Sequence, residues 1–227
     1  MMRYTIAAAA LLSLATPAFS QDPVKVDPKH HKVEIDNPQV RVLRITIPPG
    51  DKTPAHDHPA AMAIFLTDAQ NRVSPVGGTA NEQPRKRGDV QPLAASKHTV
   101  ENIGKTAAEI ILVEFKNPPM KAWKGVARDA TKVDGKHYSV AAENEHARAL
   151  RIRYGPNEKS VMHDHPPNVA VFLSSTKVKM NLPDGKSAEV AAERNAVQYS
   201  EAESHLPEMT ADGAEAVVVE LKTAAVK

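Results

Sequence analysis

The sequence contains no cysteine, few aromatic residues and almost no net charge. Without cysteine there can be no disulfide, no thiolate nucleophile and no thiolate metal ligand, so histidine must carry any soft-metal chemistry. Aromatic residues make up 4% of the chain, and the formal net charge is +2. A chain this close to neutrality gives no electrostatic reason to expect a nucleic-acid or membrane partner.

Long hydrophobic runs are also missing, and the one candidate lies at the start of the chain. Arg3 is followed by an apolar run from Ile6 to Ala15 and by small residues at Ala18 and Ser20. This run is shorter than the roughly 20 residues that span a bilayer. It therefore predicts a cleaved export signal rather than a membrane anchor. We expect residues 1–20 to be removed and the protein to be periplasmic or secreted.

The chain contains an internal repeat. The tetrapeptide His-Asp-His-Pro occurs at 56–59 and again at 163–166, a displacement of 107 positions. Segments outside this motif keep the same displacement: RVLRI at 41–45 returns as RALRI at 148–152. Towards the end, AEIILVEFK and AEAVVVELK are displaced by 106, which predicts the loss of one residue in a loop after His205. The sequence therefore predicts two duplicated domains.

Strand signals dominate both copies, separated by clusters of Pro, Gly, Asn and Asp. The expected strands are 40–47, 60–66 and 109–115, with counterparts at 147–154, 168–173 and 215–221. Short, evenly spaced strands predict an all-β protein of two antiparallel barrels or jelly rolls.

We expect the chain to divide into five parts. These are the signal at 1–20, an N-terminal arm at 21–32, barrel one at 33–117, a linker at 118–139 without a repeat counterpart, and barrel two at 140–227.

Six of the ten histidines follow the repeat: His56, His58, His98 and their images His163, His165, His205. Residues two apart on a strand project from the same face, so each His-Asp-His sends two imidazoles to one side. The third histidine can join them through strand pairing. Clustered imidazoles would repel if protonated, and a divalent ion explains why each copy keeps three. We expect the other four, His30, His31, His137 and His146, to be ordinary core or surface residues.

Two motifs resemble those of the cupin superfamily. Gly50 precedes the His-x-His motif by six positions, and Gly88, Asp89, His98 and Asn102 match the second motif. Two copies in one chain resemble a bicupin. The resemblance implies a jelly-roll barrel around a metal ion in each copy.

The chain departs from the cupin pattern at several positions. The metal-binding Glu of the first motif is replaced by Met62 or Ala63 in copy one, and by Val169 or Ala170 in copy two. Copy two also has Asn195 and Met209 in place of Gly88 and Asn102, and its Gly155 lies eight positions before His163. We expect Met62 and Val169 to line the pockets.

Three neutral imidazoles leave the charge of the ion uncompensated and coordination positions free. Ligand softness favours Fe(II), Zn, Cu or Ni over Mn, which would prefer the missing carboxylate. The resemblance to three-histidine cupins therefore implies an Fe(II)-type dioxygenase acting on a small, chelating organic anion, rather than an oxalate decarboxylase.

The alternative is a non-catalytic exported protein that binds a metal or small ligand, and a third interpretation is a double barrel that serves as an interaction module. Whether the protein is an enzyme stays open, as does homo-oligomerisation.

Gln91 and Gln198 keep their distance to the third histidine, and each is a candidate to orient a ring or a bound oxygen. An ordinary turn glutamine explains the same pattern equally well. Glu101, Glu114 and Glu220 are acid or base candidates only if they face the cavity.

Overall fold

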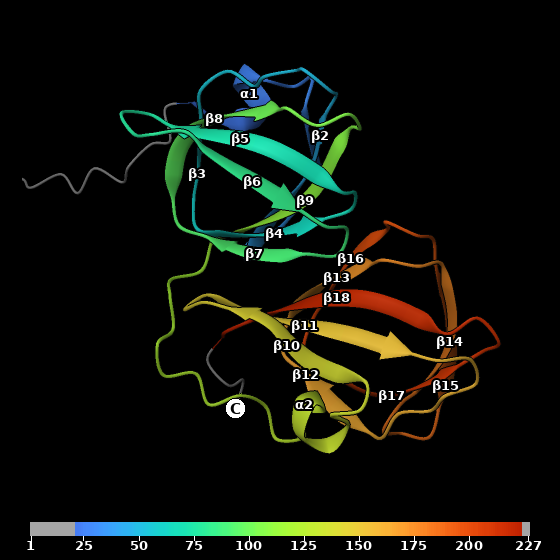
Figure 1. Cartoon of the computed structure of the whole chain (residues 1–227). Helices are drawn as coiled ribbons and strands as arrows, with labels where there is room; N and C mark the ends of the chain where they lie inside the picture. The colour runs from blue at the N-terminus through green and yellow to red at the C-terminus, as the bar shows by residue number, and fades with distance from the viewer. Residues whose placement is uncertain (1–20, 224–227) are drawn as a thin grey trace, which may run out of the picture.

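The computed structural model describes residues 21–223, which form two barrels that follow one another along the chain (Figure 1). The predicted export signal lies outside the described residues. Within residues 21–223, no helix is long and apolar enough to cross a membrane.

The first barrel is formed by one short helix and nine strands. Its elements are α1 Pro23–Val26, β1 His31–Asp36, β2 Val40–Ile47, β3 His56–His58, β4 Ala61–Phe65, β5 Ala69–Pro75, β6 Asn81–Arg85, β7 Val90–Leu93, β8 Ser96–Asn102 and β9 Ala108–Phe115. The second barrel repeats them as α2 Ala130–Val133, β10 Tyr138–Glu143, β11 Ala147–Tyr154, β12 His163–His165, β13 Asn168–Phe172, β14 Thr176–Asn181, β15 Ser187–Ala192, β16 Val197–Ser200, β17 Glu203–Met209 and β18 Ala214–Leu221.

Each barrel consists of a five-stranded and a four-stranded antiparallel sheet. The strand orders are β1-β2-β9-β4-β7 and β3-β8-β5-β6 in the first barrel. The second barrel has β10-β11-β18-β13-β16 and β12-β17-β14-β15, which is the same topology element for element. The predicted all-β fold of two tandem jelly-roll barrels is confirmed. The segments HARAL and AAERNA, whose composition left a helix possible, form no helix.

The change of displacement from 107 to 106 lies in a loop, as expected. Residues 103–107 connect β8 to β9, whereas only residues 210–213 connect β17 to β18. The strands on both sides keep their pairing, so the deletion shortens the turn without altering the sheets.

The repeat reaches further back than the sequence motifs indicated. Asp22 caps α1 by accepting a hydrogen bond from the Val24 amide, and Asp129 caps α2 by accepting one from the Thr131 amide. Asp22 and Asp129 are 107 positions apart, so the end of the expected linker does have a counterpart. The expectation of an unmatched connection was wrong there, because the capping aspartate and the short helix recur, and the contact of His137 with Asp134 repeats that of His30 with Asp27.

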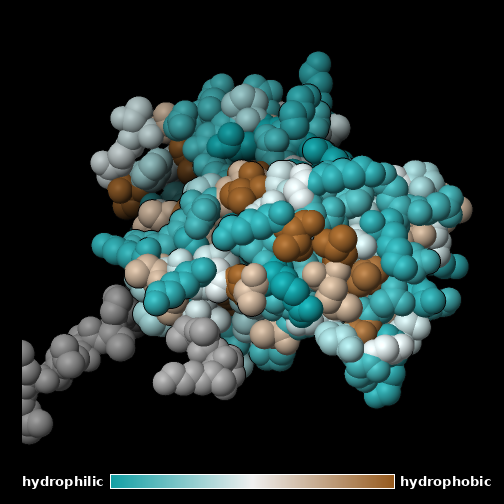
Figure 2. All heavy atoms as spheres, turned by 90° about the horizontal axis from the view of Figure 1, so that it is seen from below, coloured by the Kyte–Doolittle hydropathy of each residue, from teal (hydrophilic) through white to brown (hydrophobic). Residues whose placement is uncertain are grey.

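A shared hydrophobic core joins the two barrels. Its sixteen buried members are Val40, Val42, Met62, Ile64, Leu66, Ile111, Val113 and Phe115 from the first barrel, and Ala147, Ala149, Val169, Val171, Leu173, Val217, Val219 and Leu221 from the second. Each residue of the first set has its repeat equivalent in the second. The outer faces of the two five-stranded sheets therefore pack on each other (Figure 1). The face in Figure 2 is mainly hydrophilic, with small hydrophobic groups among the polar ones.

The opposite faces of the same sheets line the barrel interiors. Leu43, Ile45, Ala63 and Leu112 belong to an apolar cluster inside the first barrel, and an equivalent cluster lies inside the second. Central strands of the five-stranded sheets are buried on both faces, and β4 is therefore a continuous apolar run.

Candidate metal centres

Strand pairing brings the three predicted histidines of the first barrel together. β3 and β8 are antiparallel neighbours, and His56 lies directly opposite His98 in their register. His58 projects from the same face of β3 as His56. The ring centroid of His98 lies 4.9 Å from that of His56 and 5.5 Å from that of His58.

A fourth histidine, His31 on β1, joins this cluster. Its ring centroid lies 4.9 Å from that of His56 and 6.1 Å from that of His58. The ligand atoms of His31, His56 and His58 all lie within 4.8 Å of one another, a group that does not include the predicted ligand His98. Our expectation that His31 is an ordinary core residue was therefore wrong. It was overlooked because its repeat equivalent is Tyr138, so a search for histidines retained in both copies passes over it.

The second barrel assembles the predicted trio. His163 on β12 lies opposite His205 on β17, and the ligand atoms of His163, His165 and His205 lie within 4.8 Å of one another. All three are buried. The structure therefore brings the three predicted side chains close together.

All of the predicted histidines except His205 are held by a hydrogen bond at Nδ1. His56 and His163 approach the backbone oxygens of Pro54 and Val161 at 2.8 Å, and His98 contacts the Ser96 hydroxyl at 3.0 Å. Anchoring Nδ1 leaves Nε2 as the ligand atom, which is how metal-binding histidines are oriented in proteins. The Nε2 atom of His163 is buried without a hydrogen-bond partner. A divalent ion would satisfy it, so the residues present fit a metal.

A buried carboxylate holds the second histidine of each His-Asp-His motif. The Nδ1 atom of His58 lies 2.6 Å from Glu114 Oε1, and Arg41 donates to the other oxygen at 2.5 Å. Arg41 also donates to Asp22, the cap of α1, at 2.6 Å.

The second barrel repeats this relay, in which a capping aspartate binds an arginine, the arginine binds a glutamate and the glutamate holds a histidine ring. His165 lies 2.7 Å from Glu220, Arg148 donates two hydrogen bonds to Glu220, and Arg148 also bonds Asp129 at 2.8 Å. Trp123 of the linker lies beside Arg148, whose guanidinium carbon is 5.0 Å from the indole centroid. Glu114 and Glu220 are therefore positioning residues that orient a ring.

Burial favours the neutral form of His31, His98 and His163. Loss of hydration, reinforced by the neighbouring rings, lowers the pKa of His98 and of His163 to about 3. Desolvation and the charge of His56 lower the pKa of His31 to about 4. Burial raises the pKa of Glu114, but the hydrogen bonds from His58 and Arg41 outweigh it and keep the pKa below its usual value. Neutral rings are the form that binds metal.

Two residues in each copy could match the position of the missing Glu, and in both copies the alanine is the one that lines the cavity. Ala63 and Ala170 line the cavities of the first and second barrel. Met62 and Val169 lie in the core between the barrels and are 0% exposed. The expectation that these two line the pockets was wrong, because the strand runs are apolar on both faces and their periodicity cannot identify the cavity side.

Gln91 and Gln198 line the cavities beside these alanines. Gln91 is paired with Ala63 across β4 and β7, and Gln198 is paired with Ala170 across β13 and β16. The amide of Gln91 contacts Arg85 and Gln83 at 3.2 and 3.3 Å. A role in orienting a bound ligand stays a prediction for both. Glu101 pairs with Arg72 at the partly exposed end of β8.

Two of the apparent departures of the second copy preserve the backbone. Gly50 has φ of 78°, and its repeat equivalent is Asn157 with φ of 59°. Asn157, rather than Gly155, therefore forms this left-handed turn, and it precedes His163 by the usual six positions. Similarly, Gly88 with φ of 86° is replaced by Asn195 with φ of 68°. Asparagine is the non-glycine residue that best tolerates this conformation.

The remaining histidines lie outside the clusters. His30 contacts Asp27 and Asp51, and His137 makes equivalent contacts with Asp134 and Glu158. His146 contacts the backbone oxygen of Asn117. These contacts describe hydrogen-bonded structural residues.

Several solved structures share this fold. A cupin 2 conserved barrel domain protein from Leptotrichia buccalis is 12% identical, with a TM-score of 0.54 over 85% of this chain and 88% of that one. A point variant of oxalate decarboxylase from Bacillus subtilis is 13% identical, with a TM-score of 0.57 over 82% and 69%. Salicylate 1,2-dioxygenase from Pseudaminobacter salicylatoxidans is 9% identical, with a TM-score of 0.57 over 87% and 78%. No protein-family model and no curated protein matches the sequence.

At these identities the likeness concerns the fold. The tandem jelly rolls resemble those of cupin proteins, and their two histidine clusters are candidate sites for a divalent ion.

Proposed function

We propose that the protein is an exported bicupin that binds a divalent metal ion in each barrel and uses it to bind a small organic anion. The observation that carries the proposal is the orientation of the rings: those of His163 and His165 are anchored through Nδ1, and the buried Nε2 of His163 has no partner. Neutral nitrogen ligands fit Fe(II), Zn, Cu or Ni.

The residues of the chain divide the work of such a site. His163, His165 and His205 would hold the ion, and the Glu220 relay fixes the ring of His165. The bound ion would supply Lewis acidity and, for iron, redox chemistry. Ala170 provides no carboxylate at the position of the cupin Glu, and Glu203, which also lines this cavity, lies 3.7 Å from Nδ1 of His205. Apolar walls exclude water and favour a ligand with an apolar body.

We favour a dioxygenase-type activity on a small chelating anion. Three imidazoles without a carboxylate leave both charge and coordination positions available. The likeness of fold to salicylate 1,2-dioxygenase supports such chemistry by analogy alone. The second candidate is a non-catalytic protein that binds a metal or small ligand, and the four-ring cluster of the first barrel supports it.

Metal loading followed by oxygen uptake tests the proposal. The mature chain is loaded with Fe(II), Zn(II), Cu(II) or Ni(II), and bound metal is measured per chain. We expect two ions per chain, and less after His163→Ala. Oxygen consumption by the iron form with diketones, phenols and thiols then separates an oxygenase from a binding protein. Metal content that is unchanged by His163→Ala would contradict the assignment of the site.

We also propose export, based on the charge and length pattern of residues 1–20. Intact mass of the protein recovered from the periplasm tests it, and a start at Gln21 is expected. A retained Met1 or Met2 would contradict it.

A further inference from the structure

The two centres differ at a position that contacts the cluster in the same way in both barrels. In the first barrel the ring of His31 lies 4.9 Å from that of His56 and 6.1 Å from that of His58. In the second, Tyr138 takes this place, with its ring 4.8 Å from that of His163 and 5.9 Å from that of His165. The duplication therefore preserves the site of an aromatic ring but changes what the ring can bind.

We propose that His31 is the fourth ligand of the first centre, which closes that centre, and that Tyr138 leaves the second centre open to an anionic ligand. This proposal rests on the proposed function, because it presumes that both clusters hold an ion. It assigns different roles to the barrels: the first retains its ion, and the second binds the ligand.

The setting of His31 is that of a ligand. Its side chain is 1% exposed, and its Nδ1 lies 3.2 Å from the backbone oxygen of Asp27. With Nδ1 anchored, Nε2 is left as the ligand atom, as for the other rings of the cluster. His31, His56 and His58 lie within ligand distance of one another, and His98, whose ring is 4.9 Å from that of His56, would complete the tetrahedral coordination that closed zinc sites show.

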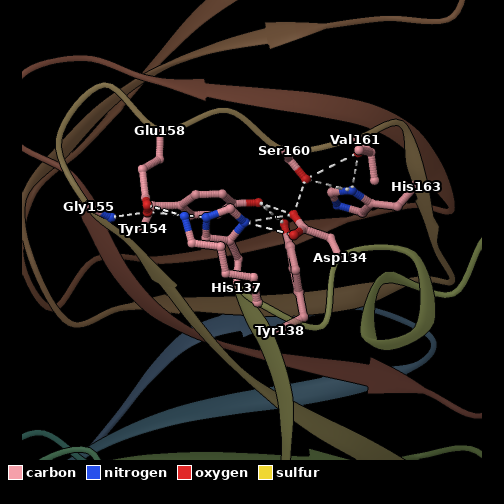
Figure 3. Close-up of polar contacts among 10 residues, drawn as sticks. Asp134, His137, Tyr138, Tyr154, Gly155, Glu158, Ser160, Val161 and His163 are labelled. Atoms are coloured by element: carbon pink, nitrogen blue, oxygen red, sulfur yellow. Dashed lines mark hydrogen bonds and ion pairs between the residues drawn. The ribbon is translucent and has the colours of Figure 1, made fainter.

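The hydroxyl of Tyr138 belongs to a separate hydrogen-bond network. Its hydroxyl lies 3.0 Å from that of Tyr154, which in turn lies 3.4 Å from Asp134 Oδ2 (Figure 3). Ser160 donates to the same carboxylate oxygen at 2.6 Å, and its hydroxyl lies 3.3 Å from His163 Nδ1.

Tyr154, the second phenol of this network, is particular to the second barrel, whereas Asp134 has Asp27 as its equivalent. The first has Ile47 and Thr53 at the positions of Tyr154 and Ser160, so it lacks the second phenol. The Tyr138 hydroxyl is thus held by neighbours away from the ion, and three imidazoles remain in the second barrel.

The cavities agree with this difference. The cavity of the second barrel measures about 250 Å³, and that of the first about 140 Å³. Phe172, Met180, Val190 and Met209 give the larger cavity apolar walls. A ligand with a chelating anionic head on the ion and an apolar body against these walls fits the second barrel.

Cobalt and azide test the assignment without any measurement of activity. Two single-centre proteins are prepared as mature chains: His163→Ala/His165→Ala keeps the first centre, and His56→Ala/His58→Ala keeps the second. Each is loaded with Co(II) and titrated with azide while visible absorption is recorded. We expect azide to change the spectrum only when the second centre is present. Adding His31→Ala to the first-centre protein should create an azide response and weaken cobalt binding by about tenfold or more.

Controls separate folding from coordination. Tyr138→Phe in the second-centre protein removes the hydroxyl without adding a ligand, and it should keep the azide response. The wild type loaded with two cobalt ions needs no substitution, and it should bind one azide per chain by calorimetry. Two azides per chain, or cobalt affinity unaffected by His31→Ala, would overturn the inference. Failure of both barrels to bind cobalt would instead refute the proposed function.

Discussion

Replacing Glu220 with glutamine tests whether the relay behind the second centre orients its metal ligand. Glu220 is fully buried and accepts hydrogen bonds from His165 at 2.7 Å and from Arg148 at 2.8 and 2.6 Å. A glutamine of the same shape removes the charge and turns its amide hydrogens towards one of these donors. The substitution therefore breaks both the ion pair and the anchor of the His165 ring.

The size of the effect follows from the burial of Arg148. Breaking a buried ion pair costs roughly 3–5 kcal/mol. Asp129 still accepts from Arg148 at 2.8 Å, so we expect the lower end, about 3 kcal/mol. For a chain of this length that corresponds to a fall in melting temperature of roughly 6–12 °C. Metal affinity should fall about 10- to 100-fold, as for other residues that orient a metal-binding histidine.

The assay is thermal unfolding by circular dichroism without metal, with metal affinity measured by competition against a chelator. Glu215→Gln is the matched control, because Glu215 pairs with Arg153 and Arg151 at 3.2 and 3.4 Å in a partly exposed site. Such pairs contribute about 1 kcal/mol or less. If Glu220→Gln has the melting temperature of Glu215→Gln and the metal affinity of the wild type, Glu220 does not orient the metal-binding ring of His165.

Three further predictions concern the cavity, pH and export. Ala170→Glu should place a carboxylate in the second cavity and weaken azide binding to the cobalt form, whereas Val169→Glu should instead lower the melting temperature, because it buries a charge between the barrels. An unchanged azide affinity in Ala170→Glu would contradict the first expectation. Because the pKa of His98 and of His163 is lowered to about 3, the metal-free unfolded chain takes up protons between pH 6.5 and 3 and the folded chain does not. Stability is therefore lost as pH falls below about 6.5, by up to about 1.4 kcal/mol per pH unit for each group. The urea midpoint of His98→Ala should fall less steeply with decreasing pH than that of the wild type. Equal slopes would argue against this source of acid sensitivity. The exported protein should have the intact mass of a chain that begins at Gln21.

The sequence was informative wherever the two copies agree. The common displacement predicted the strands and the three histidines of each centre, because a residue kept at the same strand position in both barrels faces the same interior. His56 and His98 could be joined only through a strand register that a single sequence does not supply.

The misses have physical causes. His31 was hidden because Tyr138 occupies the equivalent place, so agreement between copies was the wrong filter for a residue that distinguishes them. Met62 was wrongly placed in the cavity because both faces of its strand are buried. In such a strand the alternation of side chains does not show which face lines the cavity. Asn157 was missed because glycine was taken as the marker of a left-handed turn.

The core between the barrels consists of equivalent positions from each copy. Such a surface is self-complementary, since residue i of one barrel meets the face that contains its own image on the other. This is the geometry of an isologous dimer with its two subunits fused into one chain. A separated barrel would expose this apolar face and should pair with a second copy of itself. Because the two barrels lie in one chain, their sequences can differ, unlike those of two identical subunits. One centre can therefore lose a ligand while the other keeps it.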